Sequence, residues 1–424
     1  MNTRLHLGRL LDVADVPINL NGPGLKAHTL VVGQSGSGKS FMLGRLLEEL
    51  ASRSRARVLI LDPNSDFVKF SEVADAVWKD LPGAFSSDDD EATFRRYWEP
   101  VGVSVLTTRD AKDLALKHEK ASVSAPTISW DLRYPHEAAR LLDFDTRLDI
   151  AEVFSINRLV KGPLKDKQKT FMEFLQATEE QSSESRQGDL TEQANNRLYS
   201  RTFELARLKI WPSSGTSGSV NSSVRALFSD RPVQKVVCLD LASLAEADAR
   251  LMVTSSAIDT VWAEARKAWL AAIKEPVKGD RRIPVFVVID EAHNLGSGDA
   301  QSGLARKVLD GLTRIAAEGR KYGIYLILIT QRPSRLDATL RSQCDNVCIL
   351  RMNDRYDIQL VEQSFGFIPQ GWVQRVSDFK EGDVLLAGRL VPRPVFAHAD
   401  PRRTEEGGRN LRDAWLTDPV LDVP

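Results

Sequence analysis

Continuous apolar runs, each followed by a helix-like segment, occur in two blocks of this chain. The first block has an apolar run at His28–Val32, a segment at 40–50 whose leucines share one helical face, and a second run at Val58–Leu61. The second block has four further runs, at Val236–Leu241, Val285–Ile289, Ile324–Ile329 and Val347–Leu350. Strands that are apolar at nearly every position and alternate with helices are typical of a parallel sheet buried on both faces. The pattern predicts an α/β fold with a mostly parallel sheet.

The region between the two blocks has a different pattern. A stretch near Leu148–Leu175 is helical in its periodicity, and the polar segments Thr178–Asp189 and Pro212–Ser223 are typical of linkers or mobile loops. We therefore expect a largely helical insertion within the fold. The predicted division is residues 1–75 for an N-terminal segment and the first part of the core, 76–234 for the insertion, 235–400 for the second part of the core, and 401–424 for a C-terminal tail.

The most specific motif lies between the first strand and the first helix. It matches G-x-x-x-x-G-K-[ST] and consists of Gly33, Gln34, Ser35, Gly36, Ser37, Gly38, Lys39 and Ser40. The backbone N–H groups of such a loop point at phosphates, and the helix N-terminus adds a positive dipole end. Lys39 is expected to reach the β- and γ-phosphates, and Ser40 to bind Mg²⁺. The motif predicts a site for ATP with Mg²⁺.

Two carboxylates follow the strand Val285–Ile289, and a polar pair follows the strand Ile324–Ile329. Asp290 and Glu291 stand at the carboxyl end of their strand, where α/β sheets bind ligands. We expect Asp290 to hold Mg²⁺ through water and Glu291 to polarise the attacking water, which favours hydrolysis over mere nucleotide binding. Gln331 is interpreted as a residue that contacts the γ-phosphate or the water, the alternative being a loop or capping amide.

Other polar residues near these strands have two interpretations each. Arg320 and Lys321 are either cations that complete the site of a neighbouring subunit, a role that suits Arg better, or the cations that commonly end a helix. Asp62 either lies beside the nucleotide or caps a turn. His28 and His293 have no metal-like companions and are interpreted as structural histidines.

Composition narrows the class of partner. The chain has 424 residues, a net charge of -1 and three cysteines, which excludes a uniformly basic nucleic-acid coat and a disulfide framework. A reducing cytoplasm fits this cysteine usage. No stretch approaches the ~18 apolar residues of a membrane span, and the first residues have no apolar signal core. We therefore expect a cytoplasmic protein without a membrane partner.

Taken in order along the chain, the motifs resemble the HerA branch of the HerA/FtsK superfamily of P-loop motor ATPases. The resemblance is carried by GQSGSGKS, LILDPNSDF, VVCLDLASL, VVIDEAHNL, EGRKYGIYLILITQRPSRLD and EGDVLLAGRLVPRPVFA. It implies a RecA-like core in a hexameric ring, with nucleotide between subunits and double-stranded DNA in the centre. In this family Lys39 and Ser40 match the Walker A residues, Asp290 and Glu291 the Walker B pair, and Gln331 the sensor. Arg320 and Lys321 match the pair that supplies an interface cation, without deciding which of the two serves.

The resemblance also leaves the cellular role open between two functions. Only 32 residues precede Gly33, too few for the N-terminal β-barrel of the DNA-repair members, so we expect partners to dock differently. Barrel-less relatives resemble ATPase subunits of anti-phage systems, which accompany a separate nuclease or NAD-consuming effector. The chain is therefore expected to be a motor that translocates or remodels double-stranded DNA, or an assembly ATPase that recruits and regulates such an effector. A small-molecule kinase and a membrane-anchored pump are disfavoured.

Overall fold

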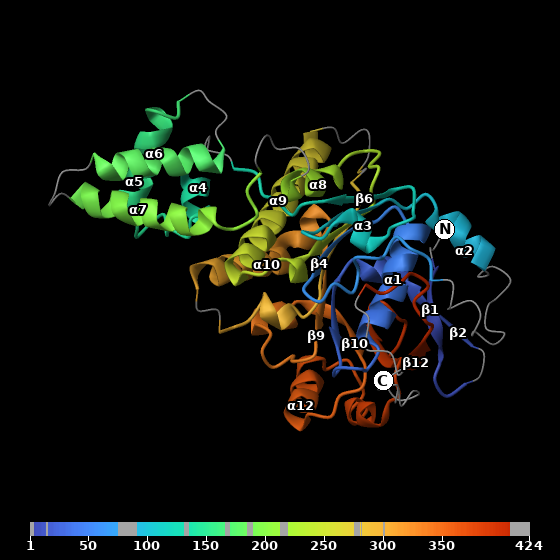
Figure 1. The fold of residues 1–424 in the computed structure, drawn as a ribbon. Helices are drawn as coiled ribbons and strands as arrows, with labels where there is room; N and C mark the ends of the chain where they lie inside the picture. The colour runs from blue at the N-terminus through green and yellow to red at the C-terminus, as the bar shows by residue number, and fades with distance from the viewer. Residues whose placement is uncertain are drawn as a thin grey trace, which may run out of the picture.

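A computed structural model describes residues 4–13, 16–74, 91–130, 135–165, 170–184, 190–212, 219–274, 280, 282–299 and 302–407. Within these ranges a single 12-stranded sheet runs through the molecule, in the order β2-β1-β12-β11-β10-β3-β9-β8-β4-β7-β5-β6 (Figure 1). The strands are β1 (Arg4–Leu10), β2 (Pro17–Asn21), β3 (His28–Val32), β4 (Arg57–Asp62), β5 (Val103–Leu106), β6 (Ala121–Ser124), β7 (Val236–Asp240), β8 (Val285–Ile289), β9 (Ile324–Thr330), β10 (Cys344–Ile349), β11 (Asp383–Gly388) and β12 (Val395–Ala399).

From β10 to β6 every neighbouring pair of strands is parallel, while β11, β12, β1 and β2 continue one edge in antiparallel pairing. The predicted α/β class and mostly parallel sheet are confirmed. The predicted strands agree with β3, β4, β7, β8 and β9 to within one residue at either end. For β10 the pattern at Val347–Leu350 found only the apolar half, because the strand begins earlier at the polar residues of Cys344–Ile349.

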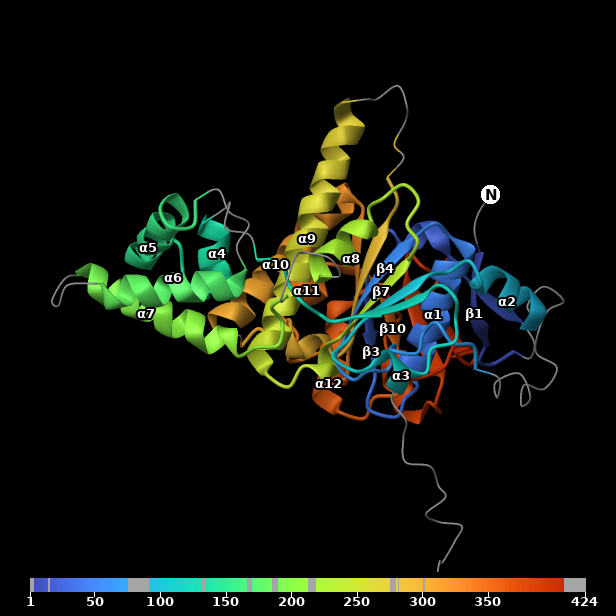
Figure 2. The same cartoon turned by 45° about the horizontal axis from the view of Figure 1, so that its top comes forward.

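Helices cover both faces of the sheet (Figures 1 and 2). They are α1 (Lys39–Arg53), α2 (Glu91–Trp98), α3 (Ala111–Leu114), α4 (Pro135–Leu141), α5 (Ile150–Lys161), α6 (Phe171–Ser183), α7 (Leu190–Ala206), α8 (Val220–Ala226), α9 (Ala247–Lys274), α10 (Gly303–Tyr322), α11 (Ala338–Ser342) and α12 (Arg355–Ser364). Successive residues of one strand enter opposite layers of the core, as Val58 and Leu59 of β4 do. This double burial explains why the strands are apolar throughout.

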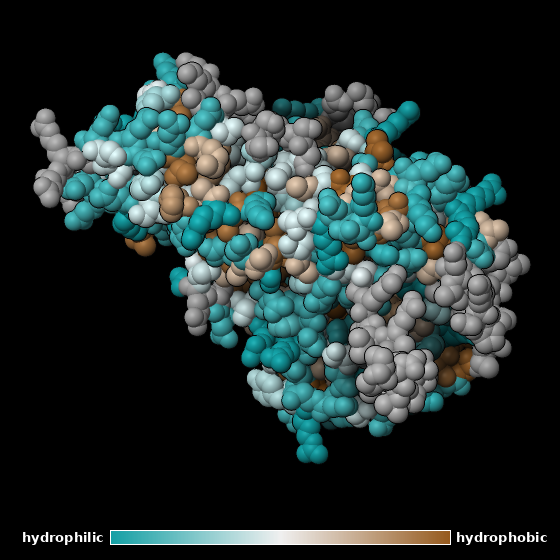
Figure 3. Space-filling model, viewed as in Figure 1, coloured by the Kyte–Doolittle hydropathy of each residue, from teal (hydrophilic) through white to brown (hydrophobic). Residues whose placement is uncertain are grey.

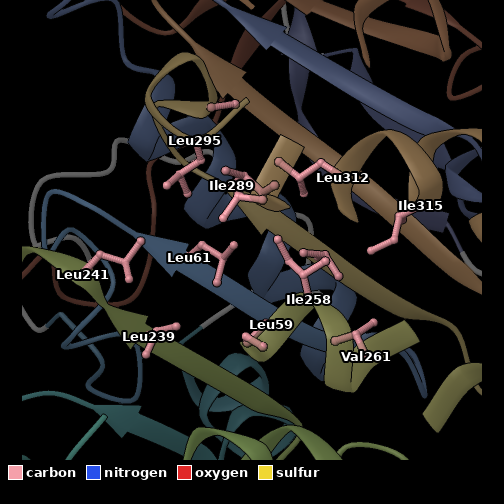
Figure 4. Close-up of a cluster of buried hydrophobic side chains, with 14 of the residues drawn as sticks. Leu59, Leu61, Leu239, Leu241, Ile258, Val261, Ile289, Leu295, Leu312 and Ile315 are labelled. Atoms are coloured by element: carbon pink, nitrogen blue, oxygen red, sulfur yellow. The ribbon is translucent and has the colours of Figure 1, made fainter. Parts of the chain in front are cut away.

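The two layers of the core have different helices. On one face, Leu43 and Leu47 of α1 pack into the same cluster as Val58. On the other face, Ile258 of α9 and Leu312 of α10 pack with Leu59, as Figure 4 shows. The sheet is thereby held rigidly between helices, which fixes the positions of the loops at its carboxyl edge.

The region predicted as an insertion divides into two parts. β5 and β6 join the edge of the main sheet beside β7, so this stretch belongs to the core. The helices α4 to α7 form a separate body beside the sheet (Figure 1). Its base is an aromatic cluster in which Phe171 stacks on Trp211 with ring centroids 3.7 Å apart and Trp130 meets both edge-on.

Some sequence expectations fall differently in the structure. The segment 178–189, expected as a linker, is helical up to Ser183, where α6 ends, because Ala177 and Thr178 bury against the body. In the other expected linker, 212–223, residues 220–223 already belong to α8, which Ser219 caps. Residues 185–189, 213–218 and 408–424, which include parts of both expected linkers and most of the expected tail, lie outside the described ranges. Across those ranges no helix is sufficiently long and apolar to cross a membrane. The face drawn in Figure 3 is mostly hydrophilic.

Candidate active site

The loop of residues 33–40 connects β3 to α1 at the carboxyl edge of the sheet. Gly38 has φ 89°, and a Cβ there would lie 2.9 Å from the backbone nitrogen of Gly382. A Cβ on Gly33 would lie 2.7 Å from Ser37 Oγ. The loop therefore depends on glycine at both ends, once for its conformation and once for close approach.

Neighbouring strands hold this loop in place. The backbone N–H of Gln34 donates to Arg351 O at 2.8 Å, and Arg351 Nη2 donates to Gly36 O at 3.1 Å. On the other side, Gly382 N donates to Ser37 O at 3.2 Å. The loop is thus clamped by the residues that follow β10 and precede β11, two segments distant in sequence.

Lys39 and Ser40 begin α1 and point toward acidic groups. The Lys39 ammonium is buried and donates to Gln34 O at 2.8 Å. Burial lowers the pKa of Lys39, and the carboxylates of Glu291, Asp290 and Asp66 oppose that effect. Ser40 Oγ donates to Asp66 Oδ2 at 2.7 Å. A cation and a hydroxyl therefore stand together at a helix N-terminus, which is the arrangement that binds phosphate.

Asp66 lies in a loop whose backbone is hydrogen-bonded to the side chain of Asp62. The fully buried Asp62 carboxylate accepts the backbone N–H groups of Asn64, Asp66 and Phe67 at 3.2, 3.1 and 2.8 Å. Burial raises the pKa of Asp62 to about 7. Of its two predicted interpretations, the contacts support the turn cap. Asn64 Nδ2 in turn donates to Asp290 Oδ2 at 3.3 Å, which links this loop to the next strand.

Asp290 and Glu291 follow β8 directly. Asp290 is buried, and its Oδ1 accepts the backbone N–H of Glu291 at 2.9 Å. Burial, with the nearby carboxylates of Glu291 and Asp66, raises the pKa of Asp290 to about 7. Glu291 has a left-handed backbone with φ 44°, a conformation rare for this residue type and often found at functional sites. Burial also raises the pKa of Glu291, which favours a carboxylate able to accept a proton.

Gln331 follows β9, the strand between β3 and β8. Its backbone lies close enough to the Glu291 carboxylate to lower the pKa of that group, against the larger effect of burial. The preceding residue, Thr330, accepts the backbone N–H of Arg332 at 3.0 Å. Because β3, β9 and β8 are adjacent and parallel, Lys39, Gln331 and the two carboxylates share one edge of the sheet.

Arg320 and Lys321 lie at the opposite edge of the same sheet. They end α10, just before β9 begins, whereas the phosphate-type loop follows the carboxyl end of β3. Arg320 Nη1 contacts Asp345 Oδ2 at 2.9 Å, and its Nη2 donates to Gln343 O at 2.7 Å. Lys321 Nζ lies 4.3 Å from the centroid of the Trp269 ring. The structure therefore does not bring either cation to the site of its own chain.

Sequence reasoning missed three residues at this edge. Asp66 bonds Ser40, Arg351 clamps the loop, and the imidazole of His293, expected to be only structural, contacts Glu291 and Thr330. For Asp66 a signal existed, because it lies in a turn-forming sequence, residues 63–66, directly after a strand that ends at the carboxyl edge. Arg351 had no local signal, because it follows β10, which is far from the loop 33–40 in the sequence.

Mg²⁺ fits the oxygen donors at this edge. In the described part of the chain no group of three or more His, Cys, Asp or Glu side chains could hold a metal by itself. Mg²⁺ usually keeps several waters and takes one or two protein oxygens together with substrate phosphates. The Ser40 hydroxyl beside the Asp66 carboxylate, with Asp290 on the neighbouring strand, supplies such oxygens.

Comparisons with known proteins show the family of this chain. The sequence model described as "Helicase HerA, central domain" matches residues 5–261, and that of the "ATPase family associated with various cellular activities (AAA)" matches 196–352. A probable helicase of Methanocaldococcus jannaschii, MJ1565, is 23% identical over 98% of this chain and 71% of its own length. The DNA double-strand break repair helicase HerA of Sulfurisphaera tokodaii is 32% identical over 43% of this chain, but the match spans only 35% of that protein.

Solved structures show the same fold. VirB4 of Thermoanaerobacter pseudethanolicus aligns with a TM-score of 0.54 at 14% identity, covering 93% of this chain and 96% of that one. The bacterial conjugative coupling protein TrwBΔN70 aligns with a TM-score of 0.54 at 15% identity, covering 96% and 93%. The α/β core is thus of the RecA-like type. The chain belongs to the family of the HerA helicase central domain, and it is an ATP-hydrolysing P-loop enzyme.

Proposed function

We propose that this protein is a ring-forming motor ATPase that uses ATP hydrolysis to translocate or remodel double-stranded DNA. The observation that supports it most is the convergence of Lys39, Ser40, Asp290, Glu291 and Gln331 at one sheet edge, in a chain whose relatives include DNA double-strand break repair helicases. The match to one such helicase covers 35% of that relative's length, and DNA as the substrate of this chain is part of the proposal.

In the proposed mechanism the loop 33–40 cradles the phosphates. Lys39 neutralises the β- and γ-phosphates; Ser40 and Asp290 would hold Mg²⁺, and the ion would offset the charge that develops on the phosphate oxygens. Glu291 takes the proton of the attacking water as the oxygen bonds to phosphorus and the bond to the ADP oxygen breaks. Gln331, whose backbone lies beside the Glu291 carboxylate, orients that water.

A neighbouring subunit supplies the remaining cation. Arg320 and Lys321 lie at the far edge of their own sheet, so each can meet only a nucleotide bound by another copy. The proposed ring, hexameric as in the family resemblance, places one of them there. Mixing Lys39→Ala with Arg320→Ala subunits tests this: a shared site predicts hydrolysis in the mixture above that of either variant alone, and no recovery contradicts a contribution from Arg320.

Contacts to DNA are proposed for the N-terminal part of α10. Arg306 is exposed there, and Lys307 Nζ lies 3.9 Å from Asp259 Oδ2. Such cations would contact backbone phosphates without reading sequence. A second basic stretch of the sequence, Lys161–Lys169, is another candidate for such contacts, and it is described only up to Lys165.

The alternative function is an assembly ATPase for a separate effector, a nuclease or an NAD-consuming enzyme. The body α4–α7 favours this alternative, because it stands beside the sheet and exposes Leu148, Ile150 and Phe154 at 81, 67 and 62%. Clusters of exposed apolar side chains commonly mark protein-binding surfaces.

One assay separates the two functions. Steady-state ATP hydrolysis is measured with and without linear double-stranded DNA, and the ring is tested by the mass of the protein in solution with ATP and Mg²⁺. A motor predicts a rate that rises several-fold with DNA. A rate indifferent to DNA contradicts the motor and favours the assembly ATPase.

A further inference from the structure

His293 connects the ends of two strands at the active edge. It lies in the short 3₁₀ turn η4 (Ala292–Asn294), directly after β8, and its side chain is buried. The imidazole Nδ1 lies 3.0 Å from Thr330 Oγ1 at the end of β9 and 3.3 Å from Glu291 Oε2. One nitrogen therefore faces both the proposed base and the strand that carries Gln331.

The surrounding hydrogen bonds determine which atom carries the proton. Thr330 Oγ1 accepts one hydrogen bond, from Arg332 N at 3.0 Å, and keeps a second lone pair for Nδ1. Glu291 Oε2 is buried and has no hydrogen-bond partner among the described residues. A lone pair on Nδ1 would face this carboxylate oxygen unfavourably, whereas an Nδ1–H donates to Thr330 Oγ1 and presents its positive end to Glu291 Oε2, 3.3 Å from the nitrogen. The contacts therefore favour the tautomer with the proton on Nδ1.

The charge state agrees with this assignment. Burial, together with the cations Arg332, Arg335 and Lys39, lowers the pKa of His293. The imidazole is thus neutral near pH 7 and offers one hydrogen at Nδ1, rather than an ionic partner that would quench Glu291 as a base.

The Glu291 carboxylate needs a neighbouring group that orients it, because the backbone of Glu291 is strained. Its backbone is left-handed, and the groups beside its carboxylate are the imidazole Nδ1 of His293, 3.3 Å from Oε2, and the backbone of Gln331. Gln331 follows β9, and His293 contacts Thr330 at the end of that strand. We propose that His293 is a positioning residue whose Nδ1–H, anchored on Thr330, orients the Glu291 carboxylate and ties it to the tip of β9. The inference deepens the proposed function and depends on Glu291 acting as the base.

Three substitutions of His293 separate positioning from packing. His293→Asn keeps an N–H donor near the place of Nδ1, His293→Gln places its donor near Nε2, and His293→Leu keeps bulk without a donor. We expect Gln and Leu to lower kcat by roughly 10- to 100-fold, the scale of a misplaced catalytic group, with KM for ATP changed less than about twofold. Asn is expected to retain kcat within about threefold of the unsubstituted protein.

Thr330→Val provides an independent variant, because it removes the anchoring hydroxyl and keeps the shape. It should lower kcat like His293→Leu, and the double variant should be no worse than the poorer single one, since both act through one contact. The urea unfolding transition shows whether His293→Leu folds. If it does not fold, Thr330→Val and His293→Asn still test the proposal.

The outcomes distinguish this inference from the proposed function. If Asn is as impaired as Leu, if all three variants keep normal kcat, or if the effects of His293→Leu and Thr330→Val multiply, then His293 does not position Glu291. Glu291→Gln is measured in parallel. If it hydrolyses ATP at the unsubstituted rate, the assignment of the base fails instead, whatever the His293 variants show.

Discussion

The buried carboxylate of Asp290 predicts that the active site destabilises the ATP-free protein. Its pKa rises from an ordinary 3.8 to about 7 in the folded chain, chiefly because burial disfavours the charged form. The folded state therefore holds this proton more tightly than the unfolded chain does. The associated stability is fully present below about pH 4 and is lost as the pH rises through about 7.

The magnitude follows from the same shift. At ~1.4 kcal/mol for each tenfold change in proton affinity, the rise to about 7 corresponds to about 4 kcal/mol as an upper bound. Asp290→Asn abolishes this charge and keeps Oδ1 as the acceptor for Glu291 N, while the Asn64 amide can reverse to suit the new group. We expect the variant to be more stable than the unsubstituted protein above pH 7, by about 1 to 4 kcal/mol, and to hydrolyse no ATP.

The assay is urea unfolding at pH 5.5 and pH 8 in a buffer with EDTA and without nucleotide. The unsubstituted protein should lose more free energy of unfolding between the two pH values than Asp290→Asn does. Asp310→Asn, which removes a charge from an exposed position of α10, is the matched control and should change the free energy by less than about 0.5 kcal/mol. Equal pH slopes for Asp290→Asn and the unsubstituted protein would refute the reasoning.

Two further substitutions test the phosphate loop and its support. Lys39→Ala removes the cation expected on the β- and γ-phosphates and should abolish tight ATP binding in a direct binding assay; near-normal affinity would contradict the role given to the loop. Arg402 is buried, and its guanidinium donates to Asp66 O at 2.9 Å and Glu405 O at 2.7 Å. These hydrogen bonds connect the C-terminal segment to the loop that carries Asp66. Arg402→Met removes both hydrogen bonds, leaves Asp66 O with the N–H of Gly407 at 3.2 Å as its remaining donor among the described residues, and should cost about 3 kcal/mol in urea unfolding. An unchanged midpoint would show that this connection does not contribute to stability.

The core of the fold could be predicted from sequence because its strands are buried on both faces. Such strands are apolar throughout, as Val285–Ile289 is, and stand out without any knowledge of their neighbours. The antiparallel pairing at the edge of the sheet was not predicted. β1 buries Leu5 and Leu7 but alternates them with Arg4 and His6, which gives the segment the appearance of a charged N-terminus. β6 is short and half-buried, so its sequence carries little apolar signal.

The active site also contains residues that the sequence predicts and residues that it does not. The phosphate loop and the carboxylates after β8 are contiguous motifs, and their spacing alone predicts the chemistry. Asp66, Arg351 and His293 act through partners on other strands, and only the strand order β10-β3-β9-β8-β4 brings them together. Arg320 is the opposite case. Its motif suggests a cation at the active site, but the topology places it at the opposite edge of the sheet.

A paired measurement on Glu291→Gln tests whether this carboxylate is the general base of an ATPase. ATP binding is measured directly, and hydrolysis is followed in the same preparation. We expect near-normal ATP affinity with hydrolysis at least ~100-fold slower, the scale of a lost general base. Undiminished turnover would contradict it, because the proton of the attacking water would then have to be taken by a group other than the carboxylate after β8.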